Sequence, residues 1–265
     1  MQQLYMIPDR NRMEESLQLA EDYHAAFEYN DFFNPAVLDD QKKIEELISF
    51  YCGQPHDRSK DTMHGAFLDV TIHSEDSLIR KASEQRLVQS MEIAQDMGLR
   101  GVVFHTGRLH GFRDEKYLEN WLNVNEIFFR ELSQKYPKQQ IYIENMFDEA
   151  PDILARLAER FENEPRIGVC LDYAHAAITN IVEEEWVRTL APYILHMHIN
   201  DNDKVNDLHQ EIGTGQIDWR AFDSGMRRFG VNASVLVEMR DLDWQRRSME
   251  YLKKNKLYPF AETTD

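Results

Sequence analysis

Nine histidine and carboxylate residues stand at or just after short apolar segments of the chain, in a pattern that could bind metal ions. They are His64, His105, Glu144, Asp172, His175, His198, Asp207, His209 and Glu238. Imidazole and carboxylate ligands together suit zinc, manganese, cobalt or iron, and no thiolate is needed. Buried carboxylates are costly unless cations or hydrogen-bond donors compensate them. We therefore predict a site for one or more divalent metal ions.

Each of these residues also has an ordinary structural interpretation. A single histidine such as His64 or His105 is most often a hydrogen-bonded core or surface residue, and Asp172 could cap a helix. Glu144 or Glu238 could pair with an arginine or cap the next helix. The metal site is favoured because all of these residues recur at the same end of successive units of the chain.

The units that must position these residues are short apolar segments alternating with longer amphipathic ones. We predict strands at Leu4–Ile7, Ala26–Tyr29, Thr62–Phe67, Gly101–His105, Ile141–Glu144, Ile167–Asp172, Ile194–Asn200 and Ser234–Glu238. The clearest helical patterns are Leu78–Met97, Lys116–Gln134, Ile153–Phe161 and Trp244–Lys254. Such alternation predicts a parallel sheet, and eight units favour a closed (β/α)8 TIM barrel. In that fold the C-terminal ends of the strands meet at one mouth, where active sites are built.

Length and composition agree with one barrel. The 265 residues show no linker or break in composition, so we predict a single TIM-barrel domain over 1–265. No Gly-rich phosphate-binding motif follows any strand, which weakens a nucleotide-binding interpretation. The excess of 47 acidic over 30 basic residues, a formal charge of −17, disfavours a nucleic-acid partner.

The sequence also indicates in which cellular compartment the protein is expected. Its first residues have no basic region followed by an apolar run, and no run of 18 apolar residues occurs anywhere, so we expect neither a signal peptide nor a membrane span. Cys52 and Cys170 form no C-x-x-C motif, and Cys170 lies in a strand where a buried thiol is expected. A cytoplasmic location is the expectation.

Six segments in order carry a resemblance to a known superfamily: VVFHTG, IYIENM, GVCLDYAHA, HMHIND, DLHQEIGTGQIDW and VLVEM. They resemble the xylose isomerase-like barrels, which include sugar isomerases and epimerases and the endonuclease IV group. Resemblance to the isomerases implies one divalent metal (Zn, Mn, Co or Mg) bound by Glu144, Asp172, His198 and Glu238. It also implies that Glu144 and Glu238 act as the acid/base pair, through an enediolate-like intermediate.

Resemblance to the endonuclease IV group implies a second interpretation of the same residues. That group builds a three-zinc site, in which His64 and His105 would share a second metal with Glu144. His175, Asp207 and His209 would hold a third. Two segments depart from the nuclease pattern: LYMIPDRNRM lacks its Gly-rich first-strand motif, and FEYNDFFNPAVLDD is acidic and aromatic where the nuclease has a basic, DNA-contacting loop.

We therefore expect a metal-dependent isomerase or epimerase of a sugar or sugar derivative. A multinuclear zinc phosphodiesterase is the first alternative, and a lyase or hydrolase of an oxidised (keto) sugar is the second. A binding barrel without catalysis is a third. Relatives with this fold are often dimers or tetramers, so a homo-oligomer is compatible with this expectation.

Five further residues are candidates for binding the small-molecule substrate. They are His196, Arg108, Lys204, Arg240 and Glu28. His196 lies two residues before His198 and so faces the same way on a strand, and this H-x-H pair resembles the sugar-acting members. The charged residues could equally be solvated. Phe32 and Phe33, after the second strand, could cover an apolar sugar face or pack in the core.

Overall fold

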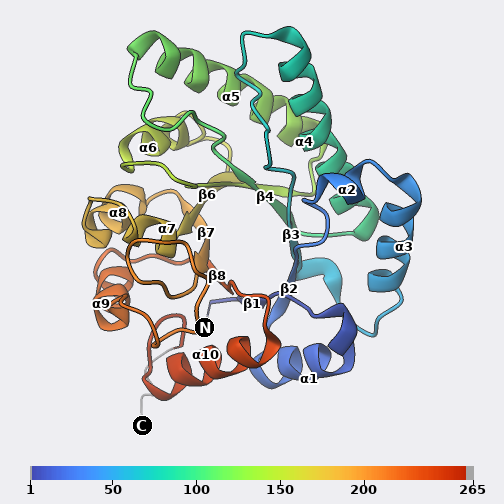
Figure 1. The fold of residues 1–265 in the computed structure, drawn as a ribbon, viewed down its shortest axis with the longest axis vertical. Helices are drawn as coiled ribbons and strands as arrows, with labels where there is room; N and C mark the ends of the chain where they lie inside the picture. The colour runs from blue at the N-terminus through green and yellow to red at the C-terminus, as the bar shows by residue number, and fades with distance from the viewer. Residues whose placement is uncertain (1, 261–265) are drawn as a thin grey trace.

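The protein is a closed parallel barrel, seen here in a computed structural model that describes residues 2–260. Within this range, strands β1 to β8 pair in sequence order, and β8 closes the ring by pairing with β1. Figure 1 shows the strands as an inner ring with the helices outside it. The prediction of a (β/α)8 barrel is confirmed. Among the described residues, no helix combines the length and the apolar character that a membrane span requires.

The strands are close to the predicted segments. Their bounds are β1 Leu4–Met6, β2 Ala26–Tyr29, β3 Thr62–His64, β4 Gly101–His105, β5 Gln140–Glu144, β6 Ile167–Asp172, β7 Ile194–Ile199 and β8 Ser234–Val237. The largest difference is at β3, which ends at His64 rather than Phe67. At that end the Gly65 N–H still donates to the carbonyl of Val103, but the next residues turn away as a loop.

Helices follow the strands and begin mostly at aspartates. The α-helices are α1 Met13–Tyr23, α2 Pro35–Leu38, α3 Gln41–Cys52, α4 Ser77–Met97, α5 Glu115–Lys135, α6 Asp152–Glu159, α7 Tyr173–Ala177, α8 Glu183–Leu190, α9 Trp219–Arg228 and α10 Leu242–Lys254. Asp76, Asp114, Asp218 and Asp241 accept hydrogen bonds from backbone N–H groups of the first turns of α4, α5, α9 and α10. These caps satisfy donors that have no partner within the helix.

Alternation along each strand sends one set of side chains outward and the other inward. In β4, Val102 and Phe104 join the large core between sheet and helices, whereas Val103 packs inside the barrel with Tyr142 and Cys170. Residues two apart on a strand face the same way. The inward set therefore continues from Val103 to His105, from Tyr142 to Glu144 and from Cys170 to Asp172, which brings the predicted ligands into the mouth.

Close packing behind β3 leads to a stability prediction. A Cβ on Gly65 would lie 2.3 Å from Phe104 Cε1, and the Phe104 ring is fully buried. Gly65→Ala should therefore destabilise the protein by about 1–3 kcal/mol, the usual cost of overpacking, measured by urea unfolding. Gly225→Ala is the control, because a Cβ there meets nothing within 4 Å in α9. Equal midpoints for the two variants would contradict this explanation of the packing.

Candidate metal centre

Strand register places the predicted ligands side by side. His105 at the end of β4 is the Cα partner of Glu144 at the end of β5. Asp172 at the end of β6 is the Cα partner of His198 on β7. Between β5 and β6 the register is offset, because Glu144 is the Cα partner of Cys170 and Asp172 lies two residues further along β6. The ligand atoms of these strand ends nevertheless lie close together at the mouth of the barrel, and we call this set of side chains the ligand layer.

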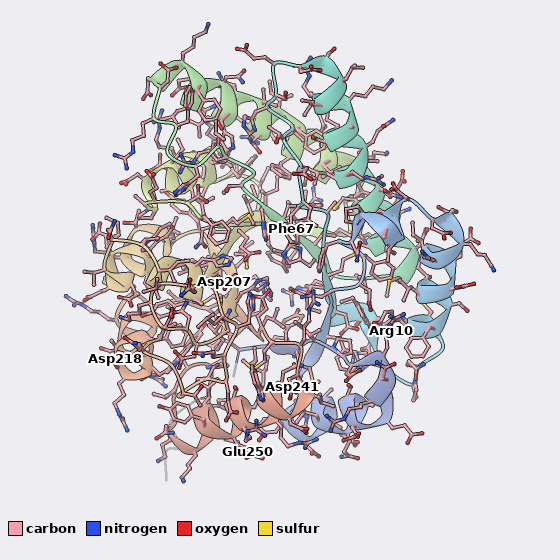
Figure 2. The ribbon with its side chains drawn as sticks, viewed as in Figure 1. Arg10, Phe67, Asp207, Asp218, Asp241 and Glu250 are labelled. Atoms are coloured by element: carbon pink, nitrogen blue, oxygen red, sulfur yellow. The ribbon has the colours of Figure 1, made fainter. Side chains whose placement is uncertain are left out.

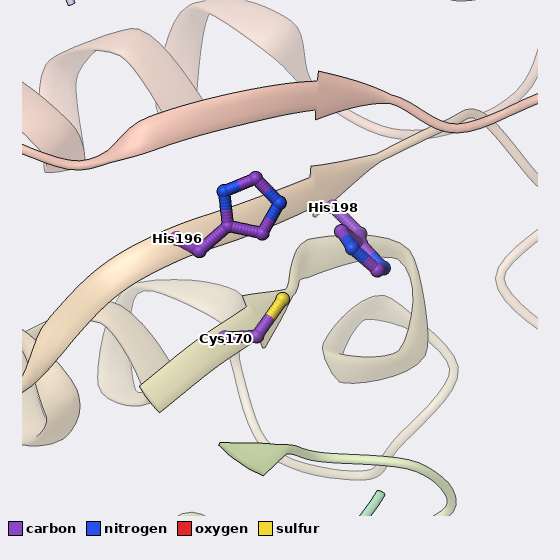
Figure 3. A group of neighbouring side chains, drawn as sticks. All are labelled: Cys170, His196 and His198. Atoms are coloured by element: carbon purple, nitrogen blue, oxygen red, sulfur yellow. The ribbon is translucent and has the colours of Figure 1, made fainter. Parts of the chain in front are cut away.

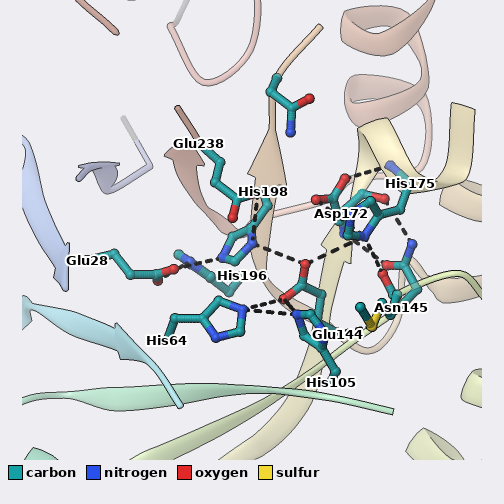
Figure 4. A network of polar contacts seen from close by, with 12 residues as sticks. Glu28, His64, His105, Glu144, Asn145, Asp172, His175, His196, His198 and Glu238 are labelled. Carbon is teal, nitrogen blue, oxygen red and sulfur yellow. Dashed lines mark hydrogen bonds and ion pairs between the residues drawn. The ribbon is translucent and has the colours of Figure 1, made fainter. Parts of the chain in front are cut away.

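The first ligand group is the four-residue set that the resemblance implied for a single metal. One ligand atom from each of Glu144, Asp172, His198 and Glu238 lies within 4.8 Å of all the others. His198 Nδ1 is 3.3 Å from Glu144 Oε1 and 3.4 Å from Glu238 Oε2. Figure 4 shows the His198 ring between these two carboxylates.

Two further groups adjoin the first. His64 and His105 approach Glu144 Oε2 with their Nε2 atoms, at 3.4 and 3.2 Å. His175 and His209 approach Asp207 Oδ2 with their Nε2 atoms, also at 3.4 and 3.2 Å. The structure therefore brings all nine predicted ligands together, and Glu144 belongs to two groups.

Ring orientations are fixed from outside the site. His64 Nδ1 lies 3.0 Å from the carbonyl of Gly65, His175 Nδ1 lies 2.8 Å from that of Asn145, and His209 Nδ1 lies 3.0 Å from that of Glu238. A carbonyl oxygen can only accept, so each Nδ1 carries the proton. In the neutral form of each ring, the lone pair of Nε2 then points into the site, as a metal ligand requires.

The donor atoms fit a divalent cation. Glu144 Oε2, Asp172 Oδ2, His198 Nδ1, Asp207 Oδ1 and Glu238 Oε2 are buried and accept or donate no hydrogen bond. Asp172 does cap α7, as its alternative interpretation supposed, because its Oδ1 accepts from His175 N at 2.7 Å. Capping uses one carboxylate oxygen and leaves the other directed at the site. Buried unsatisfied polar atoms are costly, so a metal would stabilise this arrangement.

The buried carboxylates of the cluster differ in how readily they ionise. Burial raises the pKa of Asp172 to about 7, and repulsion from Glu238 and Glu144 adds to this effect beyond the opposing attraction of His175. Burial also disfavours the charged form of Glu144, but His198 and His105 outweigh it and hold its pKa well below the ordinary value. Three buried carboxylates, Glu144, Asp172 and Glu238, thus lie close together, and one of them, Asp172, ionises less readily than usual.

A fourth group of ligand-type atoms consists of Cys170, His196 and His198, and it shares His198 with the four-residue set. Figure 3 shows the Cys170 thiol beside the rings of His196 and His198. Burial raises the pKa of the Cys170 thiol well above its usual value, which disfavours the thiolate that metals bind. Cys170 is fully buried and packs with Val103 and Tyr142, in agreement with the buried thiol that we predicted.

A cavity of about 510 Å³ opens over the ligand layer. Its lining includes His64, His105, Glu144, His175, Asp207, His209 and Glu238 at the floor and side, and Phe33, Phe67, Phe147 and Trp244 as aromatic walls. Figure 2 shows the lining residues Phe67, Asp207 and Asp241 around the centre of the barrel. Phe33 is thus a wall of the pocket, whereas its neighbour Phe32 is fully buried in the core.

The five residues predicted to bind substrate lie in different parts of the structure. Arg240 lines the pocket. Arg108 lines a neighbouring cavity of about 1020 Å³ and pairs with Asp148 at 3.0 Å, and Lys204 reaches away to Glu183 at 2.6 Å. Glu28 and His196 are fully buried below the ligand layer and do not line the pocket. Direct substrate contact, the role expected for these last two, does not agree with their positions.

Asn145 is a site residue that the sequence reasoning missed. Its Oδ1 accepts from the Asp172 N–H and its Nδ2 donates to the Asp172 carbonyl, both at 2.9 Å. Its own carbonyl accepts from His175 Nδ1. Asn145 therefore holds the ends of β5 and β6 together and orients two predicted ligands. Its place directly after the strand-end Glu144 was the available signal.

These features define a (β/α)8 barrel with a cluster of metal-ligand residues at the C-terminal mouth. The family model described as "Xylose isomerase-like TIM barrel" matches residues 15–255. The chain belongs to this family, and the resemblance found in the sequence is confirmed.

Relatives in the family carry two kinds of name. "Probable endonuclease 4" of Persephonella marina is 24% identical over 219 residues, covering 72% of this chain and 74% of that one. An uncharacterized protein of Methanocaldococcus jannaschii is 26% identical over 190 residues, covering 69% of this chain and 71% of its own.

Solved structures share the fold over nearly the whole chain. A D-tagatose 3-epimerase-like protein superimposes with a TM-score of 0.73 at 20% identity, covering 96% of both chains. A Thermus thermophilus protein soaked with ZnCl2 also gives 0.73, at 23% identity, covering 96% of this chain and 99% of that one. D-psicose 3-epimerase in the presence of D-fructose gives 0.69 at 12% identity, covering 96% and 99%. At these identities the likeness shows the fold alone.

Proposed function

We propose that this protein is a divalent-metal-dependent isomerase or epimerase of a sugar or sugar derivative. The observation that carries the proposal is the placement of two buried carboxylates, Glu144 and Glu238, on either side of His198 within one four-ligand group. Both glutamates line the pocket. Epimerisation next to a carbonyl needs two groups that can take and return a proton. The names of the structural neighbours, several of them sugar 3-epimerases, support the same class.

The metal would be held by Glu144, Asp172, His198 and Glu238. When bound, a divalent cation supplies Lewis-acid polarisation of a carbonyl and its neighbouring hydroxyl. One of the two glutamates then takes the proton from the carbon next to the carbonyl, and the other returns a proton to the resulting enediolate-like state. The aromatic walls would cover the apolar faces of the sugar and exclude water from the reacting carbon.

Size and charge support a small substrate over duplex DNA. A cavity of about 510 Å³ is within the range of small-molecule sites. Its lining carries Asp207, Asp241 and the two glutamates, and Arg240 is the basic residue beside the histidines. The whole chain has a formal charge of −17. Phosphate backbones are bound by basic surfaces, so this setting is unfavourable for a duplex.

Solvent isotope incorporation tests the proposal directly. Protein loaded in turn with Mn²⁺, Co²⁺, Zn²⁺ and Mg²⁺ is incubated in D₂O with a panel of ketoses and their phosphates, and the sugars are examined by NMR. Deuterium should enter at the carbon next to the carbonyl in at least one sugar. The exchange should disappear in Glu238→Gln, which keeps the size of the side chain and removes its base. Exchange in wild type that survives in Glu238→Gln would contradict the acid/base assignment.

A second candidate function, phosphodiester hydrolysis by several zinc ions, is favoured by one observation. All nine predicted ligands fall into three adjoining groups, two of which share Glu144, and this is the arrangement that a multinuclear site requires. This candidate predicts cleavage of duplex DNA containing an abasic site, lost in His105→Ala and in Asp207→Ala. The isomerase proposal predicts no such cleavage. A lyase or hydrolase acting on a keto sugar would use the same acid/base pair and is recognised by its products.

A further inference from the structure

A buried polar chain runs beneath the ligand layer, in the interior of the barrel. Glu28 on β2 is fully buried, as are His196 and His198 on β7 and Thr62 on β3. Glu28 Oε2 accepts from Thr62 Oγ1 at 2.7 Å and lies 3.1 Å from His196 Nε2. Glu28 Oε1 lies 2.9 Å from His198 Nε2. Figure 4 shows Glu28 on the side of His198 away from Glu144.

Donor and acceptor roles in this chain follow from the carboxylate. Glu28 Oε2 accepts from Thr62 Oγ1 and lies within hydrogen-bond distance of His196 Nε2, so this end of the side chain acts as an acceptor. His196 Nε2 and Thr62 Oγ1 therefore donate to one oxygen. His198 Nε2 lies 2.9 Å from the other oxygen in a close polar contact, although neither of these two atoms makes a hydrogen bond in the structure. His196 Nδ1 is left to accept from Ser234 Oγ at 2.7 Å.

The ring of His198 is oriented differently from the rings of three other histidines of the site. His64, His175 and His209 hold their Nδ1 proton on a backbone carbonyl and present Nε2 to the site. His198 is turned the other way: it presents Nδ1 to Glu144 and Glu238, and its Nε2 meets a side chain. Its orientation thus depends on a residue that can be replaced without altering the backbone.

We propose that Glu28 is a positioning residue for the metal centre, which holds the proton of His198 on Nε2 and keeps the Nδ1 lone pair directed at the four-ligand site. A carboxylate behind a ligand histidine fixes the ring and increases its basicity. The inference rests on the metal centre of the proposed function, but its test needs no substrate. It also gives the unexpected burial of Glu28 and His196 a role.

Glu28→Gln is the informative variant because it keeps the shape and changes the hydrogen-bond pattern. Thr62 and His196 already donate to one end of the side chain, so the amide oxygen should take that end. The NH₂ group would then face His198 Nε2 as a donor and would favour the tautomer with the proton on Nδ1. That proton would point at the metal position. We expect Zn²⁺ affinity, measured by chelator competition, to fall about 10- to 100-fold.

The matched control is Asp61→Asn. Asp61 is another fully buried barrel carboxylate, which accepts from Phe27 N and Tyr29 Oη and whose described partners include no predicted ligand. Its replacement is expected to lower folding stability, but it should leave Zn²⁺ affinity within about twofold, because the side-chain partners of Asp61 include neither Glu28 nor a predicted ligand. An equal loss of affinity in both variants would show a general packing effect and would overturn the proposal.

A second measurement does not depend on how the variant folds. In the zinc-loaded wild-type protein labelled with ¹⁵N-histidine, long-range ¹H–¹⁵N correlation spectra should show His198 protonated at Nε2 and metal-bound at Nδ1. Metal binding through Nε2 would overturn the proposal. If the wild type binds zinc and Glu28→Gln binds it equally well, only the role of Glu28 fails. If the wild type binds no divalent metal, both the proposed function and the role of Glu28 fail.

Discussion

Replacing Glu144 with Gln should lower the rate of proton exchange into the substrate at least about 10²-fold, the lower end of what a general acid or base contributes. Glu144 is fully buried against His198 and His105, and its pKa is held low, so it is ionised at neutral pH. Glutamine removes both the negative charge that binds the cation and the base that accepts the proton. Both losses act on the same step, so the effect should be among the largest of any single substitution.

Two comparisons make this result specific. Glu131→Gln, on the exposed face of α5, changes the same functional group far from the mouth and should leave exchange unchanged. Circular dichroism and metal content of Glu144→Gln separate a lost base from a lost fold or a lost metal. A folded, metal-loaded Glu144→Gln protein that still exchanges deuterium at the wild-type rate would contradict the assignment of Glu144.

Removal of divalent metal should lower the thermal stability strongly. A metal present at a thousandfold excess over its Kd adds about 4 kcal/mol to the free energy of unfolding, which corresponds to a shift in Tm of roughly 8–16 °C for a domain of this size. The physical reason is the unsatisfied oxygen and nitrogen atoms of the ligand layer. Differential scanning calorimetry with EDTA, and then with each metal restored, measures the shift. An identical Tm in EDTA and in excess metal would contradict the metal centre.

Asp172→Asn is the matched variant for this experiment. Asparagine keeps the oxygen that caps α7 through His175 N and removes the charge. Burial raises the pKa of Asp172 from its ordinary value to about 7, so its contribution to stability is present at low pH and is lost as the pH rises through 7. In EDTA above pH 7 the variant should therefore be more stable than the wild type. In excess metal the order should reverse.

Much of the fold and of the ligand layer could be predicted because both depend on local periodicity. Alternation along β4, β5 and β6 places His105, Glu144 and Asp172 inward at the strand ends, and the barrel brings strand ends together. The predicted helix at Leu78–Met97 differs from α4 by one residue at its start. The periodic spacing of apolar residues and the aspartates that cap helices are both visible in a single sequence, and they indicate where helices and strands lie.

Depth inside the barrel could not be predicted, and this is why Glu28 and His196 were misplaced. Alternation correctly puts His196 on the same face as His198, but it does not say which layer is open to the pocket. Depth depends on register: Glu28 pairs with Thr62 at the start of β3, and His196 pairs with Ser234 at the start of β8. The direction of the Lys204 side chain could not be predicted for a different reason, because its partner Glu183 is the first residue of α8 and is distant in sequence.

The metal content of the wild-type protein, purified without chelator or added metal and measured by plasma mass spectrometry, tests the central claim most directly. We expect about one divalent ion per chain, bound by Glu144, Asp172, His198 and Glu238, and its loss in Asp172→Asn. A content of about two to three zinc ions per chain would contradict the single-metal isomerase and favour the phosphodiesterase. A protein that contains no divalent metal and takes up none on titration would contradict the metal centre itself.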